Sequence, residues 1–244
     1  MTDTLPSPKA AISVVGLSKK FKTGGGLTNI NLEVPFGEVT AMIGRNGAGK
    51  STLIRTISTL ILPDEGTVTV DGFDVATQPD QARRRLGLTL GEDRSFFWRL
   101  SGRHNLEFFA ALHGLGRKAA AAATEEVLGI VGLTSVADRR VDRYSTGMRS
   151  RLGIARSLLG QPSVVLLDEP TRSLDPESAK EIQYVMGSLA SEHNAAVLVA
   201  THDMEEAALL ARQVIVLSGG QITHRIEPGG DINTLRHLMG GEPS

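Results

Sequence analysis

One segment of the sequence combines glycines, a lysine and hydroxyl side chains in a spacing suited to phosphate binding. It reads Gly44-Arg45-Asn46-Gly47-Ala48-Gly49-Lys50-Ser51-Thr52 and fits the pattern G-x-x-x-x-G-K-[ST]. Such glycines let the backbone turn its N–H groups toward anionic oxygens, and the start of the following helix also favours negative charge. Lys50 supplies a mobile charge for the β- and γ-phosphates, and Ser51 offers a hydroxyl to Mg²⁺. The segment predicts nucleotide binding; the alternative is a chance match in a glycine-rich chain.

Two adjacent acids end a second segment, Val164-Val165-Leu166-Leu167-Asp168-Glu169. Four consecutive aliphatic residues are typical of a parallel strand buried on both faces. Acids at its end cost desolvation free energy unless a cation lies nearby. In a nucleotide-binding fold, Asp168 is expected to hold Mg²⁺ through its shell, and Glu169 is expected to polarise the attacking water. The alternative is a solvated strand end.

Three further positions have two interpretations each. His202 follows the apolar run 196–200, so it is either structural or placed to touch a γ-phosphate at the carboxyl edge of a sheet. Ser145 and Gly147 precede a helix and form either an anion site or an ordinary N-cap, which the local pattern favours. Phe21 could stack on a nucleotide base or pack in the core, and its local pattern favours the core.

Alternating strands and helices must position these residues. The apolar patterns and turn signals predict the following elements. Strands are expected at 12–15, 18–22, 30–34, 39–43, 67–70, 86–90, 164–167, 196–200, 214–217 and 221–225; helices at 51–60 (with Leu53, Ile54, Ile57 and Leu60 on the apolar face), 103–113, 117–130, after Met148, and from Asp175 as N-cap with Pro176 at N1. Strand, loop and helix around 39–60 are the context that a phosphate-binding loop requires.

Composition limits the possible classes of protein. A chain of 244 residues suits one large domain, or one domain with an inserted sub-domain. The net charge of −1 gives no nucleic-acid footprint, and the absence of cysteine excludes disulfides and thiolate metal sites. Residues 1–11 lack the apolar region of a signal peptide. The longest apolar runs fall far short of the roughly 18 residues that span a bilayer, so work at a membrane would require another chain to cross it.

The order of these motifs resembles the nucleotide-binding domain of ATP-binding cassette (ABC) transporters over nearly the whole chain. The resemblance implies an α/β fold: a P-loop NTPase core with a mainly parallel sheet, an N-terminal antiparallel β part and an inserted α-helical sub-domain at about 92–160. It implies an ATPase domain over 11–228, between a flexible tail at 1–10 and a C-terminal tail at 229–244.

The resemblance also implies a role for each matching residue. The segment 44–52 becomes the Walker A loop, Asp168 the Walker B acid and Glu169 the catalytic base, with Lys50 assisting catalysis. His202 becomes the switch histidine, and Ser173-Leu174-Asp175 the D-loop. Phe21 takes the place of the aromatic that stacks on adenine. Ser145 and Gly147 belong to the signature motif, which in this family closes on the ATP of the opposite subunit.

Two positions depart from the family pattern. The signature is Tyr144-Ser145-Thr146-Gly147-Met148 instead of Leu-Ser-Gly-Gly-Gln. This form looks like that of bacterial exporters with separate ATPase and membrane subunits, the type that handles antibiotics and polysaccharides. In the loop after 86–90 the usual Gln is replaced by Glu92. A carboxylate there could bind Mg²⁺ directly or through water, but it adds negative charge near the γ-phosphate.

The resemblance implies an ATP- and Mg²⁺-dependent ATPase subunit of an exporter. We expect a dimer with two ATP molecules at its interface. A homodimer is the expected form, and a heterodimer is the alternative. We expect a permease on a separate chain, a peripheral position on the cytoplasmic face of the cell membrane, and no nucleic-acid partner. The alternatives are an importer subunit, a soluble ABC ATPase acting on DNA or ribosomes, and a mechanical ABC ATPase that drives a membrane protein without transport. The aromatics Phe96, Phe97 and Trp98 either contact the membrane subunit or pack inside the helical sub-domain.

Overall fold

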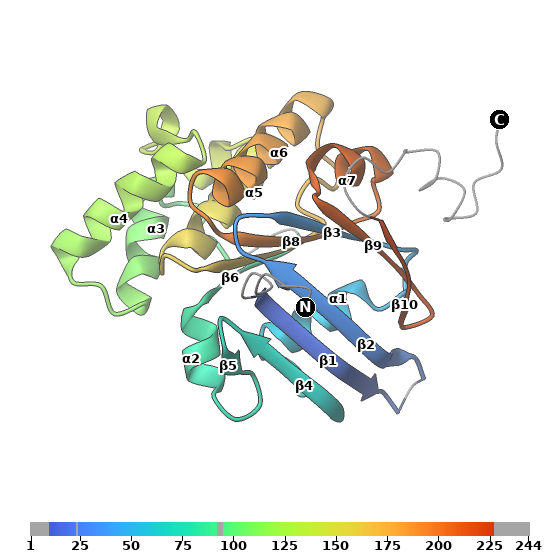
Figure 1. Ribbon diagram of the computed structural model, residues 1–244. Helices are drawn as coiled ribbons and strands as arrows, with labels where there is room; N and C mark the ends of the chain where they lie inside the picture. Colours follow the sequence, from blue (N-terminus) through green and yellow to red (C-terminus); the bar gives the residue numbers. More distant parts are fainter. Residues whose placement is uncertain (1–9, 23, 92–94, 227–244) are drawn as a thin grey trace, which may run out of the picture.

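The computed structural model describes residues 10–22, 24–91 and 95–226. Within them, two sheets and a group of helices form adjoining layers (Figure 1). The elements in chain order are β1 (Ala10–Lys20), β2 (Gly26–Pro35), β3 (Val39–Ile43), α1 (Lys50–Ile57), β4 (Glu65–Val70), β5 (Phe73–Asp74), α2 (Pro79–Arg84), β6 (Leu86–Leu90), α3 (Gly102–Leu112), α4 (Arg117–Ile130), α5 (Thr146–Leu158), β7 (Val164–Asp168), α6 (Pro176–Ser191), β8 (Ala196–Thr201), α7 (Met204–Leu210), β9 (Gln213–Ser218) and β10 (Gln221–Ile226). The expected α/β fold is confirmed.

The central sheet brings the motif-bearing loops to one edge. Its strand order is β10-β9-β3-β8-β7-β6, with parallel pairing except for the antiparallel edge strand β10. In the β3–β8 register Ile43 pairs with Thr201, and in the β7–β8 register Asp168 pairs with Ala200. Because parallel strands end on the same side, the phosphate loop, the acid pair and His202 all emerge there.

The second sheet is antiparallel, in the order β2-β1-β4-β5, and Figure 1 shows it below the central sheet. The two strand pieces expected at 12–15 and 18–22 are one strand, β1, which ends at Lys20. Its pairing with β2 shifts between Val14 and Leu17, where Gly16 has φ of 60°. Because this left-handed residue interrupts the regular pairing within β1, the sequence pattern predicted two short strands instead of one.

Helix α1 lies between the two sheets and ends earlier than expected. Leu53, Ile54 and Ile57 are fully buried, as predicted. Leu60 was wrongly placed on the same face, because it lies beyond the helix and is 58% exposed. The left-handed Thr59, with φ of 65°, turns the chain so that the Leu60 N–H bonds to the Arg55 carbonyl at 2.9 Å. This turn points Leu60 away from the core.

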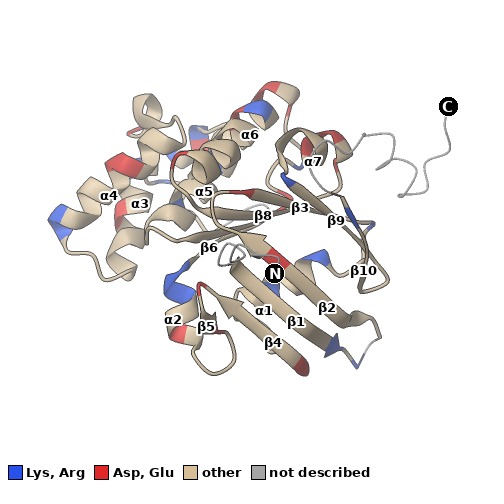
Figure 2. Ribbon diagram, in the orientation of Figure 1, with Lys and Arg blue, Asp and Glu red and all other residues tan. Residues whose placement is uncertain are grey.

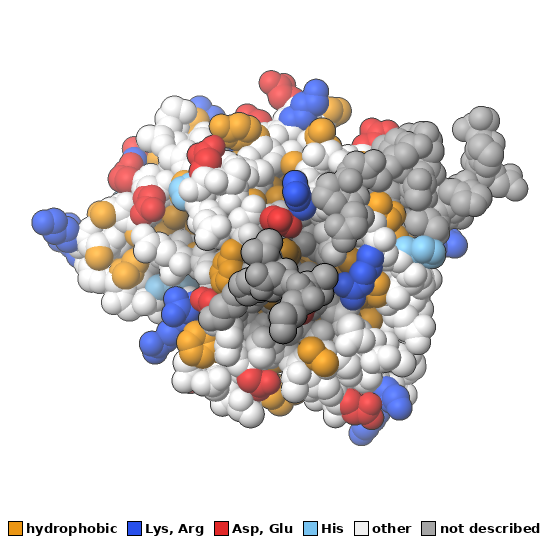
Figure 3. All heavy atoms as spheres, in the orientation of Figure 1, with side chains coloured by type: hydrophobic (Ala, Val, Ile, Leu, Met, Phe, Trp, Pro, Cys, Tyr) orange, Lys and Arg blue, Asp and Glu red, His pale blue; other side chains and the backbone are white. Residues whose placement is uncertain are grey.

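The helices α3, α4 and α5 form a lobe beside the β6 edge of the central sheet (Figure 1). Helices predicted at 103–113 and 117–130 are α3 and α4. Figure 2 shows Lys and Arg residues interspersed with Asp and Glu residues along the ribbon, and Figure 3 shows side chains of both charges scattered over the visible face, in keeping with the near-zero net charge. Among the described residues, no helix combines the length and the apolar character needed to cross a membrane.

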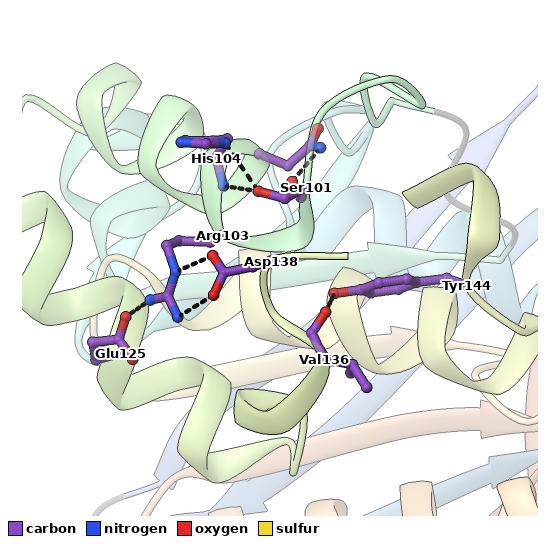
Figure 4. Close-up of polar contacts among 8 residues, drawn as sticks. Ser101, Arg103, His104, Glu125, Val136, Asp138 and Tyr144 are labelled. Atoms are coloured by element: carbon purple, nitrogen blue, oxygen red, sulfur yellow. Dashed lines mark hydrogen bonds and ion pairs between the residues drawn. The ribbon is translucent and has the colours of Figure 1, made fainter. Parts of the chain in front are cut away.

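Polar contacts fix the segment that leads into α5 (Figure 4). The Tyr144 hydroxyl donates to the Val136 carbonyl at 2.9 Å, and burial raises the pKa of this phenol, which keeps it a donor. Arg103 donates from Nε to Asp138 Oδ1 at 2.8 Å and also contacts Glu125 on α4. The start of α3 and the segment before α5 are therefore tied to the same stretch of chain.

Tyr144 also depends on a glycine at the start of α3. A Cβ added to Gly102 would lie 2.3 Å from the Tyr144 hydroxyl oxygen. We expect Gly102→Ala to lower the free energy of unfolding by about 1–3 kcal/mol, because the ring must move in a packed site. Gly129→Ala on α4 is the matched control, since nothing lies within 4 Å of its added Cβ. Its effect should range from neutral to a gain of about 1 kcal/mol. Denaturant unfolding measures both; equal stability of the two variants would contradict the packing argument.

Candidate active site

A pocket of about 640 Å³ lies at the carboxyl edge of the central sheet. It joins the phosphate loop to the loops that follow β1 and β7. Its described lining residues are Phe21, Gly24, Gly25, Gly26, Arg45, Asn46, Gly47, Ala48, Gly49, Lys50, Ser51, Thr52, Gly91, Thr146, Ser150, Asp168, Glu169, Pro170, Arg172 and Ser173. Gly44, the first residue of the loop, is not among them, and neither are Ser145, Gly147 and His202.

The phosphate loop presents unpaired backbone donors to this pocket. Gly49 is the N-cap of α1 with φ of 111°, and no side chain caps the helix. The first helical hydrogen bond runs from the Leu53 N–H to the Gly49 carbonyl at 2.9 Å. The preceding N–H groups, on residues 50–52, therefore have no partner within the helix. A Cβ on Gly49 would lie 2.7 Å from Leu27, so this position also needs glycine for space.

The central contact of the site is a carboxylate between two nitrogens. Glu169 Oε2 lies 2.5 Å from His202 Nδ1, and Glu169 Oε1 lies 3.7 Å from Lys50 Nζ. Lys50 Nζ also donates to the Gly44 carbonyl at 2.6 Å. Glu169 is 15% exposed, whereas the His202 side chain is 60% exposed. The three residues singled out from sequence as catalytic are therefore in direct contact.

Glu169 adopts a backbone conformation that is unusual for its residue type. Its φ is 54°, in the left-handed region. A strand-to-strand hydrogen bond from the Glu169 N–H to the Ala200 carbonyl at 2.8 Å holds it there, and its carbonyl accepts from the Arg172 N–H at 3.2 Å. A non-glycine residue held in this region costs on the order of 1–3 kcal/mol, and such residues cluster at functional sites.

Oxygen ligands suited to Mg²⁺ also face the pocket. The Ser51 hydroxyl and the Asp168 carboxylate both belong to its lining, and hydroxyl and carboxylate oxygens suit this hard cation. Within the described ranges, no group of three or more His, Cys, Asp or Glu residues could hold a metal by itself. Because Mg²⁺ is usually held by one or two protein oxygens together with substrate phosphates, Ser51 and Asp168 suit such a shared site. Glu92, the third expected ligand, lies outside the described residues.

The local sequence pattern favoured a core position for Phe21, and this prediction was wrong. It is 38% exposed and lines the pocket instead of entering the core. The reason is that β1 ends at Lys20, and the Gly24 N–H then bonds to the Phe21 carbonyl at 3.0 Å in a turn. The ring therefore stands outside the sheet and lines the pocket.

Ser145 and Gly147 serve the start of α5. Ser145 is the N-cap, and its hydroxyl accepts the Met148 N–H at 3.1 Å, as the local pattern predicted. A Cβ on Gly147 would lie 2.5 Å from Ser178 Oγ on α6, so this glycine allows the two helix starts to pack together. Asp175 caps α6 by accepting the Ser178 N–H at 2.9 Å, and this bond lowers the pKa of the Asp175 carboxyl.

Sequence interpretation missed two residues near the acid pair. Arg172 is an exposed cation in the pocket lining, next to Ser173 with φ of 63°. Glu206 on α7 is a buried acid close to Glu169. Arg172 could have been noticed because it lies between Glu169 and the N-cap Asp175. Glu206 gave no such signal, because acids in the first turn of a helix are common.

The α5–α6 contact gives a stability prediction. We expect Gly147→Ala to lower the free energy of unfolding by about 1–3 kcal/mol, because its Cβ would overlap Ser178. Gly187→Ala on α6 meets nothing within 4 Å and is the control, expected to be neutral or to stabilise. Thermal or denaturant unfolding of the two variants decides the matter. If Gly147→Ala proved as stable as the control, Gly147 would have no packing role.

Comparisons with known proteins agree with this geometry. A family model described as ABC transporter matches residues 27–172. The chain is 34% identical over 218 residues to the ABC transporter ATP-binding protein NatA of Bacillus subtilis (strain 168), covering 88% of each chain. It is 39% identical over 232 residues to the daunorubicin resistance ATP-binding protein DrrA3 of Streptomyces coeruleorubidus, covering 95% of this chain and 72% of that protein.

Solved structures show the same fold. The cbiO1 protein from Clostridium perfringens, part of the ABC transporter complex cbiONQ, superposes with a TM-score of 0.84 at 26% identity, covering 94% of this chain and 95% of that one. The ATP-binding cassette MJ0796, seen as a dimer in a post-hydrolysis state with ADP and Pi, gives a TM-score of 0.78 at 26% identity, covering 90% of this chain and 100% of that one.

Proposed function

This chain belongs to the ABC transporter family of ATP-binding proteins, and on that basis we propose that it powers an exporter whose membrane-spanning part is a separate chain. Its activity is that of the family, ATP binding and ATP hydrolysis. The observation that carries the proposal is the Glu169 carboxylate held between Lys50 and His202 at the edge of the pocket. Such a group can orient a water molecule for attack on a phosphoryl group.

The residues of the site have distinct parts in this proposal. The N–H groups of the phosphate loop and the Lys50 ammonium bind the phosphates of ATP and neutralise charge that develops on the transferred group. Ser51 and Asp168 would hold Mg²⁺, which would neutralise phosphate charge. Glu169 accepts a hydrogen bond from the attacking water, and His202 orients Glu169 and reaches the γ-phosphate. Phe21 stacks on the adenine ring.

The relatives and the signature support the proposed direction of transport and the separate partner chain. DrrA3 is named for daunorubicin resistance, which fits export, and the Tyr144–Met148 signature resembles that of exporters with separate membrane subunits. A relative named phosphonates import ATP-binding protein PhnC 2, from Synechococcus, is also 36% identical over 226 residues. Export is the proposal, and substrate flux in reconstituted vesicles containing the partner chain tests it. The chain would then lie on the cytoplasmic face of the membrane.

A dimer completes the site in this proposal. Ser145 is exposed and lies outside the lining of the pocket in its own chain. Thr146 and Ser150 of α5 line the pocket of their own chain, whereas the N-cap Ser145 does not, so Ser145 is the part of this helix start that meets the γ-phosphate of ATP bound by a second copy. The dimer reported for MJ0796 supports this arrangement.

Glu169→Gln tests the catalytic assignment. The amide keeps the size of the side chain but is a far weaker base, so we expect turnover to fall by about 10²-fold or more. ATP binding should persist, and an ATP-bound dimer should accumulate on size-exclusion chromatography. Steady-state phosphate release measures turnover, and unchanged turnover would remove Glu169 from this role.

Lys50→Ala is the companion variant, because it should fail at a different step. Without the ammonium, ATP affinity should weaken by about 10-fold or more, while the fold persists. Fluorescent-nucleotide titration separates this binding defect from the hydrolysis defect of Glu169→Gln. Wild-type affinity in Lys50→Ala would count against the phosphate-binding assignment.

The aromatic cluster resolves into one buried ring and two exposed rings. Phe96 is buried, whereas Phe97 and Trp98 are about half exposed, at 47% and 46%. Phe97 packs edge-to-face on Phe108 with centroids 4.9 Å apart, and the Arg149 guanidinium lies 5.5 Å from the Trp98 ring centroid. Of the two roles predicted for these aromatics, we therefore assign packing inside the helical lobe to Phe96. We assign contact with the membrane subunit to the exposed pair, Phe97 and Trp98.

Trp98→Ala tests that contact. Loss of a half-exposed ring should reduce co-purification of the membrane subunit by about 10-fold or more and leave the unfolding temperature nearly unchanged. Leu209→Ala, an exposed apolar residue on α7, is the control. Intact assembly together with a destabilised fold would show that Trp98 serves packing.

A further inference from the structure

Glu206 is an acid buried behind the catalytic carboxylate. It lies in the first turn of α7, four residues after His202, and is 1% exposed. Among the described residues, neither of its carboxylate oxygens has a hydrogen-bond partner of good geometry. Burying an ionised carboxylate without partners carries a large desolvation cost, so the position needs an explanation beyond packing.

Its neighbours belong to the two loops that carry the catalytic residues. The hydroxyls of Thr171 and Thr201 lie close enough to act on its carboxyl. Thr171 is two residues after Glu169, and Thr201 directly precedes His202. The Thr201 hydroxyl accepts the Asp203 N–H at 3.0 Å, which leaves its own proton for donation. The Glu206 carboxyl is thus near one hydroxyl at the end of β8 and one in the loop that follows β7.

The surroundings favour the uncharged carboxyl. Burial is the main cause that raises the pKa of Glu206, and the nearby carboxylates Asp203 and Glu169 raise it further, against the opposite effect of the two threonine hydroxyls. A neutral carboxyl has one O–H donor and one carbonyl acceptor, so it can bond to two hydroxyls at once. It also adds no negative charge beside Glu169, where phosphate must approach.

Building on the roles proposed above for Glu169 and His202, we propose that Glu206 is a positioning residue that bridges Thr171 and Thr201 and so fixes the two catalytic loops relative to each other. The consequence is geometric. The 2.5 Å contact between Glu169 Oε2 and His202 Nδ1 joins side chains from different loops. It persists only while those loops keep their spacing, which a misplacement of about 1 Å would destroy.

Two near-isosteric variants separate bridging from burial. Glu206→Gln keeps a neutral donor and acceptor, so kcat should stay within about 3-fold of wild type. Glu206→Leu keeps the apolar volume but cannot bond to either threonine. For it we expect kcat to fall by about 10-fold or more, with KM for ATP changed by less than about 3-fold because the phosphate loop is untouched. Glu205→Gln and Glu205→Leu on the same helix are the controls, since Glu205 is exposed.

A threonine variant keeps the test decisive if Glu206→Leu fails to fold. Thr171→Val removes one hydroxyl with little change of shape, so it should lower the kcat of the otherwise wild-type protein. When it is added to Glu206→Leu, or to Glu206→Ala if only that variant folds, it should lower kcat no further, because the bridge is already absent. Wild-type kcat in both Glu206→Leu and Thr171→Val would overturn the proposal. So would loss of activity in Glu206→Gln equal to that in Glu206→Leu, because the negative charge would then be what matters.

These outcomes are distinct from failure of the catalytic assignment itself. If Glu169→Gln retained turnover, Glu169 would lose its role whatever the Glu206 variants did. If Glu169→Gln lost turnover and the Glu206 and Thr171 variants did not, the catalytic assignment would hold and the bridge alone would fail.

Discussion

The contact of Glu169 with Lys50 and His202 depends on the register of three parallel strands. Lys50 follows β3, Glu169 follows β7 and His202 follows β8, and these strands are neighbours in the order β3-β8-β7. A register slip of one residue would shift the end of a strand, and the segment that follows it, by about 3.3 Å and would turn the side chains of that strand to the opposite faces. The carboxylate would then lose both nitrogens. The positions of the other site residues depend on the same register.

Burial on both faces keeps that register. Along β8, Val197 and Val199 enter the hydrophobic core on the helical side, whereas Leu198 and Ala200 enter the core shared with α1 and the antiparallel sheet. A slip would place residues of each core in the other, and neither core could fill its volume without cavities or overlap. The strain at Glu169, with φ of 54°, is thereby supported by surroundings that cannot easily relax.

The sequence was informative where one local rule decides a position. The buried strand 39–43, the Asp175 N-cap with Pro176, and the Ser145 N-cap all matched the structure, because periodicity or capping chemistry is local. It misled where tertiary geometry decides: Leu60 continues a helical pattern that a left-handed Thr59 interrupts, and Phe21 follows a strand that ends one residue earlier. The order of motifs predicted separate roles for Glu169 and His202 at one sheet edge, but only the structure shows that their side chains are in contact. Nothing local could indicate Glu206, because its neighbours Thr171 and Thr201 come together only in the fold.

Rigid contacts connect the acid loop to the exposed aromatics of the helical lobe. The loop after Glu169 ends at the Asp175 cap of α6, and Ser178 in the first turn of that helix packs on Gly147 in α5. Two residues further along α5, Arg149 donates to the Tyr144 carbonyl and lies over the Trp98 ring. No flexible side chain separates Ser178 from Gly147, so the start of α5 cannot shift toward α6 without steric overlap. A displacement that pushes the start of α6 toward α5 would therefore also displace α5, and with it the surface at Trp98. These contacts form a continuous path from the acid loop to the exposed aromatics of the helical lobe.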